Sequence, residues 1–302
     1  MAVALDVRAD RPIELADLVA RVERDLDPRD DATLLALAPD LAALAAHPTF
    51  LGEHVARGLA TPDAFQRGIA YTGRSFVLAS GEKFLVRANL WDPLDGDPWG
   101  GNDPGALRQQ IGMYGLLHDH DFSFVTAGYF GPGYETDLYE CDPERIEGYL
   151  GEEVALRPLG RRTLTRGSLL YFERRRHVHA QATPAAPSVS LNLFALDPTT
   201  PFVSQYYFDD VTHRIVAMTS DPYNGRLLLC DLAAALHVTA ARAPLAALAR
   251  RHPSPGLRAG AVRALASLEG DDAPSVWRAA LDDPHPLVRR RARAALDAGA
   301  SP

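Results

Sequence analysis

The middle of this 302-residue chain consists of short strand-like segments that follow one another at close intervals. Strand signals recur at 75–79, 83–91, 112–120, 122–130, 134–140, 153–158, 168–173, 176–181 and 188–196. Turn residues separate them, as in Ser80-Gly81, Gly131-Pro132-Gly133 and Arg166-Gly167. Many short strands with frequent turns predict an antiparallel β-sandwich or barrel.

The flanking segments have a helical pattern instead. Residues 12–70 carry apolar side chains three and four positions apart, and Pro28, Pro39, Pro48 and Pro62 divide them into short helices. From about residue 232 the chain is helical again, and 253–265 aligns with 284–296 at an offset of 31 residues. We therefore expect a helical segment over 1–72, a β-domain over 73–230 and helical repeats over 231–302.

Composition excludes several functional classes. A hydrophobic fraction of 47% and a charged fraction of 23% are ordinary for a folded, soluble protein. The net charge of -8 argues against binding to nucleic acid or to anionic membranes. No apolar run approaches a membrane span, and no signal peptide is apparent, so a cytoplasmic location is expected. Cys141 and Cys230 form no CxxC motif, which argues against a zinc–thiolate site.

Two His-x-His pairs lie within the strand-like segments, His118 with His120 and His177 with His179. Alternate residues of a strand point to the same face, so each pair can direct two imidazoles into one cavity. Histidine is the commonest protein ligand for borderline transition metals, and three neutral imidazoles with open positions are typical of a catalytic site. One pair alone would equally fit packed or solvent-facing histidines; two pairs favour a metal centre.

The spacing around both pairs resembles the cupin family. The first cupin motif opens with a glycine and two histidines, here Gly112, His118 and His120. The second has a turn, a histidine and a closing asparagine, here residues 165–167, His177 or His179, and Asn192. This resemblance covers about residues 75–200. It implies a jelly-roll barrel that holds a metal in its mouth, with His118, His120 and one histidine of the later pair as ligands.

The chain departs from the general cupin pattern at one ligand. The usual glutamate would fall at Phe124 or Val125, and neither side chain can bind a metal. A three-histidine site is therefore implied, which is typical of iron(II) cupin oxygenases of the thiol-dioxygenase kind. The spacing of Gly133 and Glu135-Thr136 is similar to cysteine dioxygenases. Phe194, however, stands where that group has its closing tyrosine, and Asn192 where it has a supporting histidine.

The resemblance favours His179 over His177 as the third ligand, because Gln181 and Thr183-Pro184 follow it as in more of the related variants. His177 would then support the site or relay a proton on the same face. The 2-oxoglutarate arrangement remains an alternative. It needs a carboxylate in the middle ligand position, where this chain has His120.

Three further residues are candidates for catalytic roles. Arg87 could anchor a substrate carboxylate through its planar guanidinium, with Arg74 as an alternative. The resemblance supports this role, because related oxygenases place such an arginine on an early strand. Strand alternation leaves open which face Arg87 occupies. Tyr129 and Tyr134 are candidates to hydrogen-bond a bound oxygen species, whereas most other tyrosines are expected to pack.

Taken together, the sequence predicts a mainly β protein with a cupin (jelly-roll) barrel, flanked by an N-terminal helical segment and C-terminal α-helical repeats. Asp283-Pro284 to Val288-Arg289 resembles a HEAT repeat motif. The expected function is a non-haem Fe(II) oxygenase or hydroxylase that uses O2 on a small polar metabolite, amino acid or peptide side chain. A non-catalytic sensor module and a metal-dependent isomerase or lyase stay open as alternatives. The repeats would dock a protein partner, self-associate or form a lid.

Overall fold

The computed structural model describes residues 4–7, 11–66, 74–93, 114–198, 204–218 and 223–299. They form two compact units, one made of Met1–Asp142 and Ala155–Thr200 and the other of Pro143–Val154 and Pro201–Pro302. Each unit is described by itself below. The sequence-based boundaries at residues 72 and 230 stay predictions.

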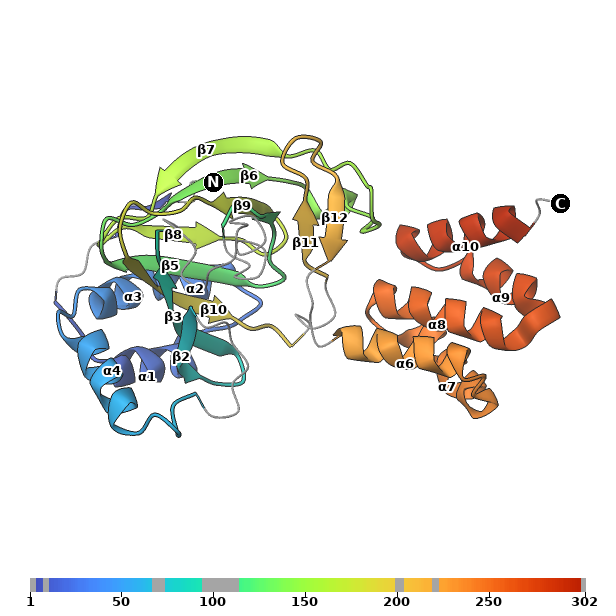
Figure 1. Cartoon of the computed structure of the whole chain (residues 1–302), viewed down its shortest axis with the longest axis horizontal. Helices are drawn as coiled ribbons and strands as arrows, with labels where there is room; N and C mark the ends of the chain where they lie inside the picture. The colour runs from blue at the N-terminus through green and yellow to red at the C-terminus, as the bar shows by residue number, and fades with distance from the viewer. Residues whose placement is uncertain are drawn as a thin grey trace, which may run out of the picture. The chain divides into compact units, whose positions relative to one another are not determined.

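The first unit contains two antiparallel sheets (Figure 1). The first sheet has six strands in the order β1-β8-β5-β10-β3-β2, and the second contains the run β4-β9-β6-β7. The bounds of these strands are β1 Ala4–Leu5, β2 Ser75–Ser80, β3 Phe84–Trp91, β4 Leu117–His118, β5 Ser123–Phe130, β6 Glu135–Glu140, β7 Arg157–Thr163, β8 Leu169–Phe172, β9 His177–Gln181 and β10 Ser188–Ala195.

The predicted fold class is correct in part. The antiparallel sheets are confirmed, but within the described residues the two sheets do not close into one jelly-roll barrel. The edge strands of the first sheet are β1 and β2, and β7 is an edge strand of the second. No pairing among the described residues joins β1 or β2 to β7. Helices before and after the sheets make the chain mixed α and β, and not mainly β.

Four short helices precede the sheets, α1 Leu15–Asp25, α2 Asp31–Ala36, α3 Ala38–Ala45 and α4 Phe50–Ala60. Local chemistry sets their ends. A reciprocal capping box between Glu14 and Asp17 starts α1, and the Asp30 side chain accepts the Ala32 N–H at the start of α2. Pro39 lies in the first turn of α3, where its missing N–H costs no helical bond. The predicted proline-divided helices are therefore confirmed.

Strand alternation gives the first sheet two different sides. One side, here called the outer side, packs against α1–α4 in a single apolar core. Its strand residues include Val86, Val125, Leu191 and Leu193, all completely buried. The opposite, inner side carries four aromatic residues and one leucine that pack in one cluster with Tyr134 and Leu138, and they are Trp91, Phe124, Phe172, Phe194 and Leu170. The site described below lies on this inner side.

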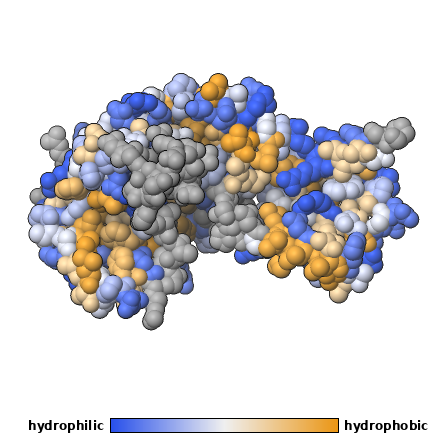
Figure 2. Space-filling view, viewed as in Figure 1, coloured by the Kyte–Doolittle hydropathy of each residue, from blue (hydrophilic) through white to orange (hydrophobic). Residues whose placement is uncertain are grey.

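The second unit contains the hairpin of β11 Tyr206–Phe208 and β12 Ile215–Met218, followed by helices. The helices are α6 Tyr223–Ala235, α7 Arg242–Arg251, α8 Pro255–Glu269, α9 Ala273–Ala280 and α10 Pro286–Gly299. Cys230, Leu245, Leu257 and Ala261 form one of their buried clusters. Figure 2 shows apolar side chains gathered over α6, where Leu228 and Leu229 are more than half exposed.

The 31-residue repeat of the sequence is visible as a recurring contact. Arg258 donates from Nη1 to the carbonyl oxygens of His252 and Pro253, at 2.8 and 3.1 Å. Its counterpart Arg289 donates from Nη1 to the carbonyl oxygens of Asp283 and Pro284, at 2.7 and 2.6 Å. Arg258 additionally holds the Asp283 carboxylate through two hydrogen bonds of 2.8 Å. This bidentate ion pair ties one repeat to the next.

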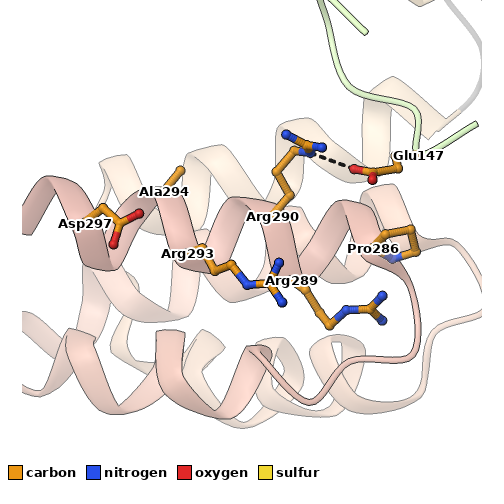
Figure 3. A pocket seen from close by; sticks show the side chains of 7 residues that line it. All are labelled: Glu147, Pro286, Arg289, Arg290, Arg293, Ala294 and Asp297. Carbon is orange, nitrogen blue, oxygen red and sulfur yellow. Dashed lines mark hydrogen bonds and ion pairs between the residues drawn. The ribbon is translucent and has the colours of Figure 1, made fainter. Parts of the chain in front are cut away.

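A polar cavity of about 370 Å³ lies beside α10. In Figure 3, Arg290 reaches toward Glu147, and the two side chains form a 2.6 Å hydrogen bond. The Arg290 guanidinium also lies 3.9 Å from the centre of the Tyr149 ring. The lining residues are Glu147, Pro286, Arg289, Arg290, Arg293, Ala294 and Asp297.

Within the described residues, no single helix is both long and apolar enough to cross a membrane. Residues 31–45 and α4, taken together across a bend of 72°, meet both criteria in the part of the chain that the structure describes.

Candidate metal centre

Three histidines meet on the inner side of the first unit. His118 in β4 stands directly opposite His179 in β9, and His120 follows two residues after His118. The Nε2 atom of His179 lies 3.1 Å from Nε2 of His120 and 3.1 Å from Nε2 of His118. Two nitrogens bound at about 2.0–2.1 Å to one ion, at a right angle, lie roughly 3 Å apart. The spacing therefore fits a shared metal ion.

The tautomer and charge of these histidines suit metal binding. The Nδ1 atom of His118 lies 2.8 Å from the carbonyl oxygen of Leu116, so it carries the proton and leaves the Nε2 lone pair for a metal. Burial lowers the pKa of His118. Burial, with the neighbouring histidines, holds the pKa of His179 well below its usual value. Neutral imidazoles at neutral pH bind a metal without first releasing a proton.

Aromatic rings surround the three imidazoles. The His120 ring centre lies 4.8 Å from Phe122 and 5.1 Å from Phe124. The His179 ring centre lies 4.4 Å from that of Phe172. These contacts fix the imidazole orientations and keep bulk water from one side of the site. His118 and His120 are only partly buried, whereas His179 is 1% exposed.

His177 lies outside this cluster. It shares a strand face with His179 and is buried, but its Nδ1 atom accepts the Glu173 backbone N–H at 2.8 Å. In the strand register it stands opposite Glu140. The structure thus brings together the favoured set of His118, His120 and His179, and it gives His177 a role in the preceding turn.

Arg87 lies on the same side of the first sheet as the histidines. Its strand neighbours Val86 and Ala88 belong to the outer core, so Arg87 points inward. Its guanidinium carbon lies 4.5 Å from the centre of the Phe194 ring, and its charge contributes to the lowered pKa of His118. Arg74, the alternative, forms an ion pair with Asp92.

The two candidate tyrosines lie on opposite sides of the first sheet. Tyr134 belongs to the inner cluster, where its ring centre lies 3.9 Å from that of Trp91 and burial raises its pKa. Tyr129 packs with the outer core. Its hydroxyl donates to the His47 carbonyl oxygen and accepts the Leu51 N–H, both at 3.2 Å. Tyr129 therefore anchors the N-terminal helices and is not brought to the histidines.

Sequence reasoning missed several inner residues. The Trp91 indole N–H donates to Ser190 Oγ at 2.9 Å, and both residues lie on the inner side. Gln181 places an amide atom 3.2 Å from His179 Nε2. Gln181 lies two residues after His179, so strand alternation alone could have placed it on the same face as His177 and His179. Gly112, the first residue of the cupin-like motif, lies outside the described residues.

One family model matches part of the chain. Residues 212–297 match the family model of HEAT repeats, which confirms the predicted helical repeats. No curated protein matches the sequence.

Several solved structures resemble parts of the chain. A DMSP lyase from Ruegeria pomeroyi is 16% identical over 61% of this chain and 90% of the other, with a TM-score of 0.28. A hydroquinone 1,2-dioxygenase from Sphingomonas sp. TTNP3 is 9% identical over 42% and 68%, with a TM-score of 0.26. A cupin 2 domain-containing protein from Halorhodospira halophila is 18% identical over 43% and 68%, with a TM-score of 0.23. The chain spans only 46% of a further DMSP lyase structure. Matches this weak do not transfer an activity.

Proposed function

We propose that the chain is a non-haem iron(II) oxygenase that uses O2 on a small polar substrate carrying a carboxylate. The observation that carries this proposal is that the Nε2 atoms of His118 and His120 each lie 3.1 Å from Nε2 of His179. The metal-ligand cluster found among the described residues contains three histidines and no carboxylate. Such a set leaves positions for substrate and O2, as in facial-triad oxygenases.

The donor set fits iron(II), which would supply the one-electron chemistry that O2 requires. The chain's own residues hold the ion and control its surroundings. Three neutral ligands leave the charge of a divalent ion uncompensated, so an anionic substrate group is attracted to the site. The phenylalanines around His120 and His179 limit water access to the reacting groups.

Arg87 would bind the substrate carboxylate. It lies on the inner side, and its guanidinium stacks on Phe194, which fixes the plane of its donors. In the register of β3 and β10 it faces Asn192, a residue that is 2% exposed. Asn192 Nδ2 has no hydrogen-bond partner among the described residues, so it is available to a substrate oxygen.

Tyr134 would act as a hydrogen-bond donor to the substrate. Burial raises its pKa, so the hydroxyl keeps its proton at neutral pH. A protonated phenol suits an oxygenase, in which a developing negative charge on oxygen must be stabilised.

The proposal is tested on protein purified without oxygen and loaded with Fe(II). We expect one iron per chain, and O2 consumption with members of a panel of small carboxylates and amino acids. His179→Gln is expected to lose both properties, whereas the matched variant His177→Gln is expected to retain the iron. The two residues share one strand face, so the pair separates metal binding from the loss of any buried imidazole.

Two results would contradict the proposal. Wild-type protein that binds no metal, with His118→Ala silent in every measurement, excludes the metal centre. Stoichiometric iron binding without O2 consumption across the panel, combined with a ligand-dependent change in the helical repeats' protection from hydrogen exchange, indicates the sensor alternative.

A further inference from the structure

Gln181 is the last residue of β9, two positions after His179. It is 7% exposed, and its amide nitrogen lies 3.2 Å from His179 Nε2. Its amide oxygen is buried and has no hydrogen-bond partner among the described residues. A buried amide with one end at the histidine cluster and the other end unpartnered calls for a ligand.

The Nε2 atom of His179 has three polar neighbours at similar distances. It lies 3.1 Å from His118 Nε2, 3.1 Å from His120 Nε2 and 3.2 Å from the terminal amide atom of Gln181. The amide atom thus has the same separation from His179 as the other two metal-binding nitrogens. The oxygen and nitrogen of an amide exchange places by a half-turn of the side-chain end. That half-turn puts the carbonyl oxygen where the nitrogen now lies.

We propose that Gln181 is a fourth ligand of the metal, bound through its amide oxygen. This inference rests on the proposed metal centre. Phe124 and Val125, where the cupin-like pattern would place a glutamate, cannot bind a metal, and Gln181 supplies an oxygen from β9 instead. Because an amide is neutral, the fourth ligand leaves the charge of the ion unchanged. The site therefore selects an anionic substrate group more strongly than a glutamate-bearing site would.

Cobalt(II) tests the proposal without any catalytic reaction. It replaces iron(II) in nitrogen and oxygen sites, and its visible absorption reports the number of ligands. We compare wild type with Gln181→Leu, which keeps the approximate volume, and with Gln181→Asn, which keeps the amide but shortens its reach. Both variants are expected to bind Co(II) about 10–100-fold more weakly in competition with a chelator, and to change the intensity of the visible bands.

Gln181→Glu completes the set. It keeps an oxygen in place and adds a charge, so we expect Co(II) affinity at or above that of wild type and weaker binding of the anion azide to the Co(II) protein. If Gln181→Leu fails to fold, Gln181→Asn and Gln181→Glu still give opposite expected results. Unchanged affinity and spectrum in Gln181→Asn, with wild type binding Co(II), would overturn the role of Gln181 alone. Failure of wild type to bind Co(II) would overturn the metal centre itself.

Discussion

The two sides of the first sheet use the same strands for opposite purposes. In β10, Leu191 and Leu193 are fully buried and pack against the N-terminal helices, whereas Ser190 and Asn192 between them lie on the inner side. The outer side is apolar and stabilises the unit. The inner side buries polar groups, which is costly unless they are hydrogen-bonded or bind a ligand. The side on which a residue lies therefore decides what its substitution changes.

Several buried polar atoms on the inner side lack hydrogen-bond partners among the described residues. His179 Nδ1, Gln181 Oε1 and Asn192 Nδ2 are buried and have no hydrogen-bond partner among the described residues. A buried polar atom in that state costs about 1–3 kcal/mol. Natural proteins accept such conflicts mainly at functional sites. One of these atoms belongs to His179 itself and one to Gln181, whose amide contacts His179, so two of the three belong to the histidine cluster.

The largest expected effect is on the inner side. His179→Gln should reduce the iron content from one per chain to less than about a tenth, because the central ligand of the cluster is lost. The free energy of unfolding of the metal-free protein should hardly change. Without a metal, the burial of three polar imidazoles is itself costly, and the variant removes one of them. Iron analysis and urea unfolding of the metal-free protein check both parts. If the metal-free His179→Gln variant is unfolded, the inner side is needed for the stability of the first unit.

The second-largest effect is expected on the outer side, where a substitution should change the stability and not the metal binding. Leu193→Ala should lower the free energy of unfolding by about 2–5 kcal/mol, because Leu193 is completely buried beneath the N-terminal helices. At temperatures where the variant stays folded, its Fe(II) affinity should equal that of wild type. Chelator competition measures this affinity. A parallel loss of stability and affinity would mean that the two sides are not separable.

Arg87 is expected to have an intermediate effect. Arg87→Lys keeps the charge but loses the planar pair of donors, so KM for a carboxylate substrate should rise about 10-fold or more with little change in iron content. Steady-state O2 consumption gives KM and kcat separately. Loss of iron in Arg87→Lys, or an unchanged KM, would contradict the role of Arg87 in binding the substrate carboxylate.

Some of this arrangement follows from sequence and some does not. His118 and His120 could be assigned together because they are only two residues apart. The strand predicted over 112–120 is wrong at its end, however, because β4 ends at His118 and His120 lies beyond it. The same two-residue spacing could not separate His177 from His179, which share a face. Register decides between them: His179 stands opposite His118, whereas His177 stands opposite Glu140. The side occupied by Arg87 or Tyr129 depends on where the N-terminal helices pack, and barrel closure depends on distant strand edges. Neither is encoded in a local pattern.

Tyr129 and Tyr134 provide the smallest and most specific contrast. Tyr129→Phe removes the hydroxyl that bridges His47 and Leu51, and should lower the free energy of unfolding by about 1 kcal/mol. It should leave kcat and iron content unchanged, because this hydroxyl faces the helices. Tyr134→Phe should instead lower kcat with a smaller change in stability. Urea unfolding and O2 consumption of the two variants, measured side by side, check the assignment. If Tyr129→Phe is the variant that slows turnover, the functional side of the sheet has been assigned wrongly.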